Sequence, residues 1–183
     1  MKKIICIVLA LMLTLTAVAA LAVSSKTNED LQAVTAEGAT VTKAEEVEPA
    51  VEAVLEDLDA AQTEGKSVVE ALPEEAKAAL EEIKSEVLPA GEEFTQINEV
   101  VNLTVDVEDD ATQLILNMDL VKDYEEEQKL AALVGVPVEE EVKWFALPAV
   151  GQKDGSINLI IEDEGLLNLL KANKSNLIVM IVE

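Results

Sequence analysis

The chain has 183 residues and a formal net charge of −24, with 37 acidic residues against 13 lysines. It contains no histidine and no arginine, and its only cysteine is Cys6. This composition excludes Ser-His and Cys-His nucleophilic pairs, histidine metal sites and bidentate arginine clamps. The negative charge also excludes nucleic acids and anionic membrane surfaces as partners, because both repel an acidic protein.

Residues 1–22 have the pattern of a secretory signal peptide. Two lysines precede an uncharged apolar run that ends in small-residue cleavage sites, Ala17-Val18-Ala19 and Ala20-Leu21-Ala22. The alternative is a retained membrane anchor, because the uncharged stretch from residue 4 to 25 is long enough to span a bilayer. The small-residue sites favour cleavage, which would remove Cys6 and predicts a secreted or extracellular protein.

Residues 23–46 and 47–90 lead to two different predictions. The first stretch is polar and has no sustained period, which predicts a flexible acidic leader. The second predicts a hairpin of two helices that begin near Pro49 and Pro73. Apolar residues recur there at helical spacing, namely Val51, Val54, Leu55 and Leu58, then Ala76, Leu80, Ile83 and Val87. Between the helices, Ser67 and Glu70 have the spacing of a capping box.

Residues 93–183 predict β-strands, because the apolar period changes from 3.6 to 2 after Gly91. The strands are expected near 101–107, 114–120, 130–136, 142–148, 156–162 and 176–182, with a helical turn at 165–173. We expect the first two to pair as a meander. Asp154-Gly155 predicts a hairpin turn. The continuous apolar run 176–182 predicts a central strand with both faces covered.

The same region is similar to a small C-terminal β-sandwich module of uncharacterised secreted bacterial proteins. The segments that carry the similarity are NLTVDV, QLILNM, WFALPAV, DGSINLII and NLIVMIV. The similarity covers about half of the chain and rests on pattern alone. It departs from the module at residues 122–141, where acidic runs replace a Gly-rich turn. The resemblance implies a β-sandwich in an extracellular setting, with no known activity.

Together these patterns predict an α+β fold, in which an N-terminal helical hairpin precedes a small antiparallel β-sandwich of immunoglobulin-like or fibronectin-like size. Trp144 and Phe145 alternate along one strand, so their rings point to opposite faces and cannot form one ligand platform. We expect Trp144 at the centre of the sandwich, because a buried aromatic side chain dominates a small core.

The clustered carboxylates of Asp106, Glu108 and Asp110 are the candidate metal ligands. Oxygen ligands of this kind suit Ca²⁺, and they support a hypothesis of weak calcium binding. The EF-hand pattern fails, because Ala111 occupies the glycine position. A solvated acidic loop is the alternative interpretation.

Two acidic triplets, 125–127 and 139–141, flank the apolar run 130–138. They are interpreted as charges that protect an edge strand from pairing with another chain, or as an acidic patch for a basic partner. The sequence GKS at 65–67 is not a phosphate-binding loop, because Ala60 stands where that motif needs its first glycine.

The sequence therefore predicts a secreted or cell-surface, non-enzymatic interaction or structural module, with no catalytic residues and no cofactor beyond Ca²⁺. Its partner would be an extracellular protein or glycan. The alternatives are a carboxylate-based extracellular hydrolase and an adhesion-type module that binds calcium weakly. Self-association is a further possibility, through the helical residues Val51, Leu55, Leu58, Leu80 and Ile83.

Overall fold

The computed structural model describes residues 31–173 and 176–183, so the expected signal peptide lies outside the described residues. The strands are β1 (Leu31–Glu37), β2 (Ala39–Lys43), β3 (Ile97–Val107), β4 (Leu114–Leu120), β5 (Lys129–Val138), β6 (Glu141–Gly151), β7 (Ile157–Ile161) and β8 (Asn176–Val182). The helices are α1 (Pro49–Thr63), α2 (Val68–Ala71), α3 (Glu74–Val87) and α4 (Glu164–Asn173). Over these two ranges, no helix has the length and apolar character needed to cross a membrane.

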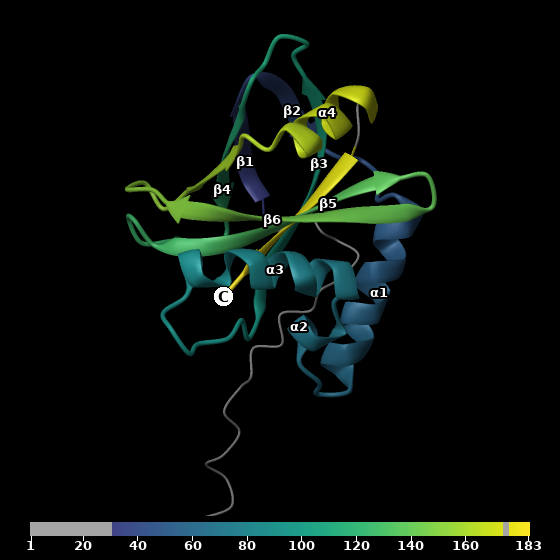
Figure 1. Ribbon diagram of the computed structural model, residues 1–183, viewed down its shortest axis with the longest axis vertical. Helices are drawn as coiled ribbons and strands as arrows, with labels where there is room; N and C mark the ends of the chain where they lie inside the picture. Colours follow the sequence, from purple (N-terminus) through teal and green to yellow (C-terminus); the bar gives the residue numbers. More distant parts are fainter. Residues whose placement is uncertain (1–30, 174–175) are drawn as a thin grey trace, which may run out of the picture.

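The eight strands form one antiparallel sheet that curls into a nearly closed barrel (Figure 1). Their order is β1-β4-β7-β6-β5-β8-β3-β2. The two end strands, β1 and β2, are consecutive in the chain and lie side by side, which brings the ends of the sheet together. Gly38 joins them with a φ of +82°, and a Cβ there would lie 2.5 Å from the backbone oxygen of Gln113. This tight turn therefore requires glycine.

The predicted β-sandwich is wrong, because a single curled sheet encloses the core. Alternate residues of a barrel strand point to the interior, so a barrel produces the same alternating sequence pattern as two stacked sheets. The alternation therefore located the strands correctly but did not distinguish between these two architectures. The Asp154-Gly155 hairpin between β6 and β7 is confirmed, with Gly155 at a φ of +88°.

The predicted meander is also wrong, because β3 and β4 are not neighbours. β3 pairs with β8 and β2, whereas β4 pairs with β7 and β1. The missing partners come from residues 31–43, inside the stretch 23–46 that was expected to be a flexible leader. These two strands are rich in Ala and Thr and largely exposed on one face, so their apolar period is weak.

Two hydrophobic cores lie on opposite faces of the sheet. The inner core fills the barrel with side chains such as Val101, Leu116, Met118, Leu130 and Ile181, and α4 adds Leu166 and Leu170 to it. The outer core lies between the opposite face of the sheet and helices α1, α2 and α3, which gather on one side of the barrel (Figure 1). Alternate residues of β8 enter the two cores, which confirms the predicted central strand with both faces covered.

The helices begin near the predicted residues, but the predicted helical hairpin is wrong. α1 and α3 each pack against β5 and β6, so their apolar stripes face the sheet. Val51, Leu55, Leu58 and Leu80 are at most 2% exposed, and Ile83 is half-buried. The sheet already covers these side chains, which removes them from the surface through which self-association was expected.

Trp144 and Phe145 lie on opposite faces of β6, as their alternation predicts. Trp144 packs against the outer core, whereas Phe145 packs against the inner core, and both are half-buried. The expected placement of Trp144 at the centre of the main core is therefore wrong. Its ring lies over Gly135 of β5, where an added Cβ would approach the indole to 2.7 Å. Glycine thus leaves the space in which the ring packs.

Candidate functional site

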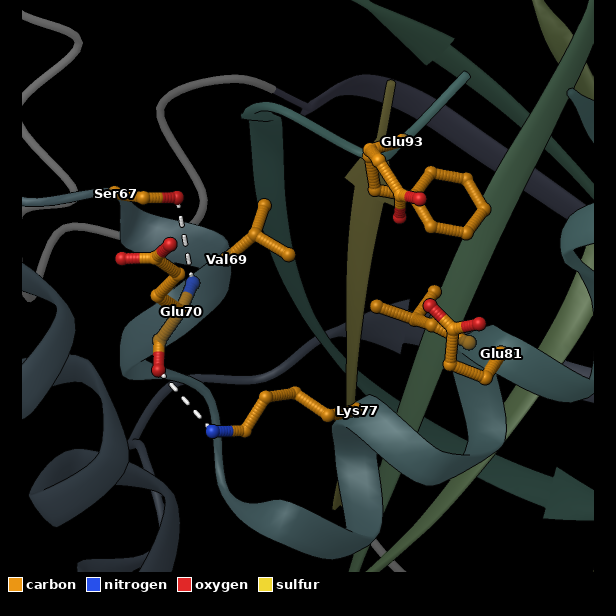
Figure 2. Close-up of a pocket in the computed structure, with 8 residues that line it drawn as sticks. Ser67, Val69, Glu70, Lys77, Glu81 and Glu93 are labelled. Carbon is orange, nitrogen blue, oxygen red and sulfur yellow. Dashed lines mark hydrogen bonds between the residues drawn. The ribbon is translucent and has the colours of Figure 1, made fainter. Parts of the chain in front are cut away.

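A groove lies beside α2, and we call it the α2 groove (Figure 2). Its volume is about 390 Å³. It is formed where α2, the first half of α3 and the segment leading to β3 meet. Its lining consists of Ser67, Val69, Glu70, Lys77, Leu80, Glu81, Glu93 and Phe94.

The floor of the α2 groove is apolar. Leu80 and Phe94 are 2% and 8% exposed, and both belong to the outer core. Leu80 lies on the buried stripe of α3, and Val69, half-buried on α2, packs against the same core. Because the floor is continuous with the packed core, its shape is fixed before any ligand binds.

The rim of the α2 groove is acidic, with the carboxylates of Glu70, Glu81 and Glu93 (Figure 2). Lys84 joins two of them, because its Nζ lies 3.2 Å from Glu81 Oε1 and also contacts Glu93 Oε2. The hydrogen bond to Glu93 raises the pKa of Lys84, and Glu81 adds to this effect. This bridge connects α3 to the segment before β3 along one side of the groove.

The wall formed by α2 is held in place by two interactions. Ser67 Oγ accepts a hydrogen bond from the backbone N–H of Glu70 at 3.4 Å, which confirms the cap predicted by the Ser67 and Glu70 spacing. Lys77 Nζ donates to the backbone oxygen of Glu70 at 3.2 Å and pairs with Glu74 at 2.6 Å. Lys77 therefore holds the end of α2 against α3 (Figure 2).

A second polar group, the barrel-end cluster, lies where the segment 121–128 crosses one end of the barrel. It comprises Gln96, Glu99, Lys122, Tyr124, Gln128 and Glu183. Glu99 is 4% exposed and accepts hydrogen bonds from Tyr124 Oη at 3.0 Å and from the Lys122 backbone N–H at 2.8 Å. Burial raises the pKa of Tyr124 well above its usual value, and the charge of Glu99 raises it further. This cluster anchors the segment to β3.

Glu183 is the second carboxylate of the barrel-end cluster. It accepts hydrogen bonds from Lys122 Nζ at 3.0 Å, Gln128 Nε2 at 3.0 Å and Gln96 Nε2 at 3.2 Å. Burial acts to raise the pKa of Glu183, but hydrogen bonds from neighbouring side-chain amides and Lys122 outweigh it, so this pKa lies below its usual value. The polar groups of the cluster therefore bind one another.

The structure does not bring the predicted calcium ligands together into a site. Asp106, Glu108 and Asp110 lie exposed at the end of β3 and in the turn after it. Among residues 31–173 and 176–183, no group of three or more acidic, histidine or cysteine side chains is arranged to hold a metal ion. Calcium binding by these three residues stays a prediction.

The two acidic triplets lie at the two ends of β5, in the segment before it and in the turn that leads into β6. Their interpretation as protection for an edge strand is wrong, because β5 pairs with both β6 and β8. Glu127 and Glu139 have positive φ values of 65° and 59°, which places them at tight turns. The first triplet therefore follows the loop geometry. The second triplet ends at Glu141, where β6 begins, and this part of β6 pairs with β5 alone, because β7 pairs only with residues 149–151.

Sequence reasoning missed the α2 groove, although it identified the cap at Ser67 and the apolar position of Leu80. The groove needs residues from 67–70, 77–81 and 93–94 to meet, and only the packing of both helices on one sheet brings these segments together. Phe94 could have pointed to the groove, because it is one of only two phenylalanines in the chain. Comparisons with known proteins found no matching family model, no similar curated protein and no similar solved structure.

Proposed function

We propose that this protein is a secreted or cell-surface, non-enzymatic binding module whose ligand site is the α2 groove. The observation that carries the proposal is the combination of a preformed apolar floor with a rim of three carboxylates. A floor of this kind binds an apolar group by excluding water, and the few charged groups at its rim orient the ligand.

A protein or peptide ligand fits this site better than a glycan. Sugar rings are usually bound by stacking on exposed aromatic faces, and the chain has only four aromatic residues, Phe94, Tyr124, Trp144 and Phe145. Phe94 and Tyr124 are buried, and Trp144 and Phe145 pack against the two cores. An apolar side chain from a polypeptide needs no such platform.

The binding function can be tested by selecting peptides from a displayed random library on the immobilised protein without its first 22 residues. Selected peptides are expected to shift the NMR signals of Val69, Leu80 and Phe94. Val69→Asp places a charge on the floor and is expected to abolish their binding. Val121→Asp is the matched control, because Val121 is 60% exposed and lies outside the groove. The proposal is contradicted if Val69→Asp and Val121→Asp lose peptide binding equally. It is also contradicted if the peptides leave the NMR signals of the groove residues unchanged.

The extracellular location has its own test. The full chain is expressed in a bacterial host with its native N-terminus, and the exported protein is analysed by mass spectrometry. We expect a protein that begins after Ala19 or Ala22, because both follow a small-residue cleavage pattern. An intact chain that stays in the membrane fraction would support the alternative of a retained anchor.

A further inference from the structure

A second concavity, which we call the α1 depression, lies on the other side of α2. Its volume is about 530 Å³, and it shares Ser67 and Glu70 with the α2 groove. The rest of its lining comes from α1 and the connection to α2, namely Asp57, Ala60, Ala61, Glu64, Lys66 and Ala71. The two concavities therefore form one surface that α2 divides, with Glu70 on the dividing wall.

The carboxylates of this surface differ in whether they already have a cation. Lys84 pairs with Glu81 and Glu93, and Lys66 pairs with Glu64 at 2.5 Å. In contrast, no ion pair within the described part of the chain involves the carboxylate of Glu70 or of Asp57. Both side chains are exposed, and both line the α1 depression.

The neighbouring lysine does not neutralise Glu70. Lys77 Nζ donates to the backbone oxygen of Glu70 and pairs with the carboxylate of Glu74, 2.6 Å away. The Glu70 carboxylate therefore keeps its acceptor capacity beside the apolar floor. Lys84 shows that the same surface holds an ammonium group between two carboxylates when one is supplied.

We propose that the ligand is a basic peptide segment that lies across α2, with an apolar side chain in the α2 groove and a flanking lysine or arginine between Glu70 and Asp57. This inference rests on the proposed function, because it names the partner of the same site. An unpaired carboxylate forms strong charge-assisted hydrogen bonds with such a cation. The chain's net charge of −24 also speeds the approach of a basic partner.

The test uses fluorescence anisotropy with three labelled probe peptides of equal length, based on glycine and serine. One has two lysines that flank a leucine, one has the same lysines without the leucine, and one has two glutamates that flank a leucine. We expect the first peptide to bind most tightly, with an affinity that falls as salt is added. Binding of the glutamate peptide as tightly as the lysine peptide would overturn the proposal.

Matched variants separate a specific cation site from general attraction to an acidic protein. Glu70→Gln and Asp57→Asn are each expected to weaken binding of the lysine-leucine peptide about threefold to fivefold, the upper range for losing one solvent-exposed ion pair. Glu108→Gln removes the same charge from an exposed turn remote from α2 and is expected to change the affinity less than about twofold. An equal effect of all three substitutions would show general electrostatic attraction only and would overturn the proposal.

The outcomes also separate this inference from the proposed function. If library-selected peptides lack basic residues but still lose binding in Val69→Asp, the α2 groove is a ligand site and the basic partner is wrong. If neither selected peptides nor the lysine-leucine probe responds to Val69→Asp, both proposals fail. Unchanged melting curves for Glu70→Gln and Asp57→Asn are expected, because both side chains are exposed.

Discussion

The barrel-end cluster and the rim of the α2 groove both hold carboxylates near a lysine, but they differ in exposure. Glu99 is 4% exposed and is held by a tyrosine hydroxyl and a backbone N–H. The Glu81 and Glu93 side chains are 63% and 68% exposed and share Lys84. The first arrangement satisfies a charge that would otherwise be costly to bury, whereas the second gains little from an ion pair that water screens.

This difference teaches that carboxylates in one acidic protein have separate roles. The buried carboxylate of Glu99 holds the segment 121–128 against β3. Those at the groove rim contribute little to folding and so are free to take part in binding. Three predictions test this contrast, in order of decreasing effect.

Removal of the buried Glu99 carboxylate should have the largest effect on the free energy of unfolding. Glu99→Ala leaves the Tyr124 hydroxyl and the Lys122 backbone N–H without their acceptor, and it should lower the free energy of unfolding by about 3 kcal/mol, since each buried unsatisfied group costs about 1–3 kcal/mol. Urea denaturation measures this change. Glu99→Gln keeps an acceptor oxygen and should lose about 1 kcal/mol or less. Equal stability of Glu99→Ala and the unsubstituted protein would contradict this role.

Raising the pH above about 10 should also destabilise the protein through the barrel-end cluster, but by less than Glu99→Ala. Below about pH 10 the Tyr124 hydroxyl is protonated in both the folded and unfolded chains. Above that pH the unfolded chain loses the proton while the folded chain keeps it, because burial and Glu99 raise the pKa of Tyr124. Stability should therefore fall by up to about 1.4 kcal/mol per pH unit as pH rises above 10.

Tyr124 is the only tyrosine, so its near-ultraviolet absorbance reports its ionisation directly. Tyr124→Phe is the control, because it removes this titration and leaves the lysines unchanged. If both proteins lose stability equally between pH 10 and pH 11, lysine deprotonation rather than Tyr124 explains the loss.

The smallest effect should come from the exposed rim. Lys84→Met removes the cation between Glu81 and Glu93 and should leave the melting temperature unchanged within error, because solvent screens this pair. The same variant should bind the lysine-leucine probe more tightly, because two more carboxylates lose their internal cation. A clear fall in melting temperature would show that the rim, like the barrel end, is part of the stability of the fold.

Local features of this fold were readable from the sequence because they depend on neighbouring residues. Pro49, the cap at Ser67 and the turn at Gly155 each act through their own backbone geometry, and the run 176–182 is apolar on both faces. The pairing of β1 with β4 was not readable, because it joins distant segments, such as Leu31 and Leu120. Nothing local distinguishes such a partner from any other exposed strand.

The polar sites also depend on contacts between distant segments, which the sequence does not reveal. Glu99 looks like any other acid in a chain with 37 of them, and only its inward orientation after the irregular register near Asn98 makes it structural. The α2 groove depends on three segments that meet on the sheet. The acidic run from Asp106 to Asp110, which stood out in the sequence, is exposed at the end of β3 and in the turn after it.

The hairpin of β1 and β2 has a consequence for association between chains. Its two strands occupy both ends of the sheet, so one short segment covers the outer edges of β4 and β3 together. A chain cut after residue 43 would expose two long strands with unpaired backbone groups, which is the arrangement that templates pairing between molecules. Loss of residues 31–43 would therefore convert the barrel into a species that associates through its edges.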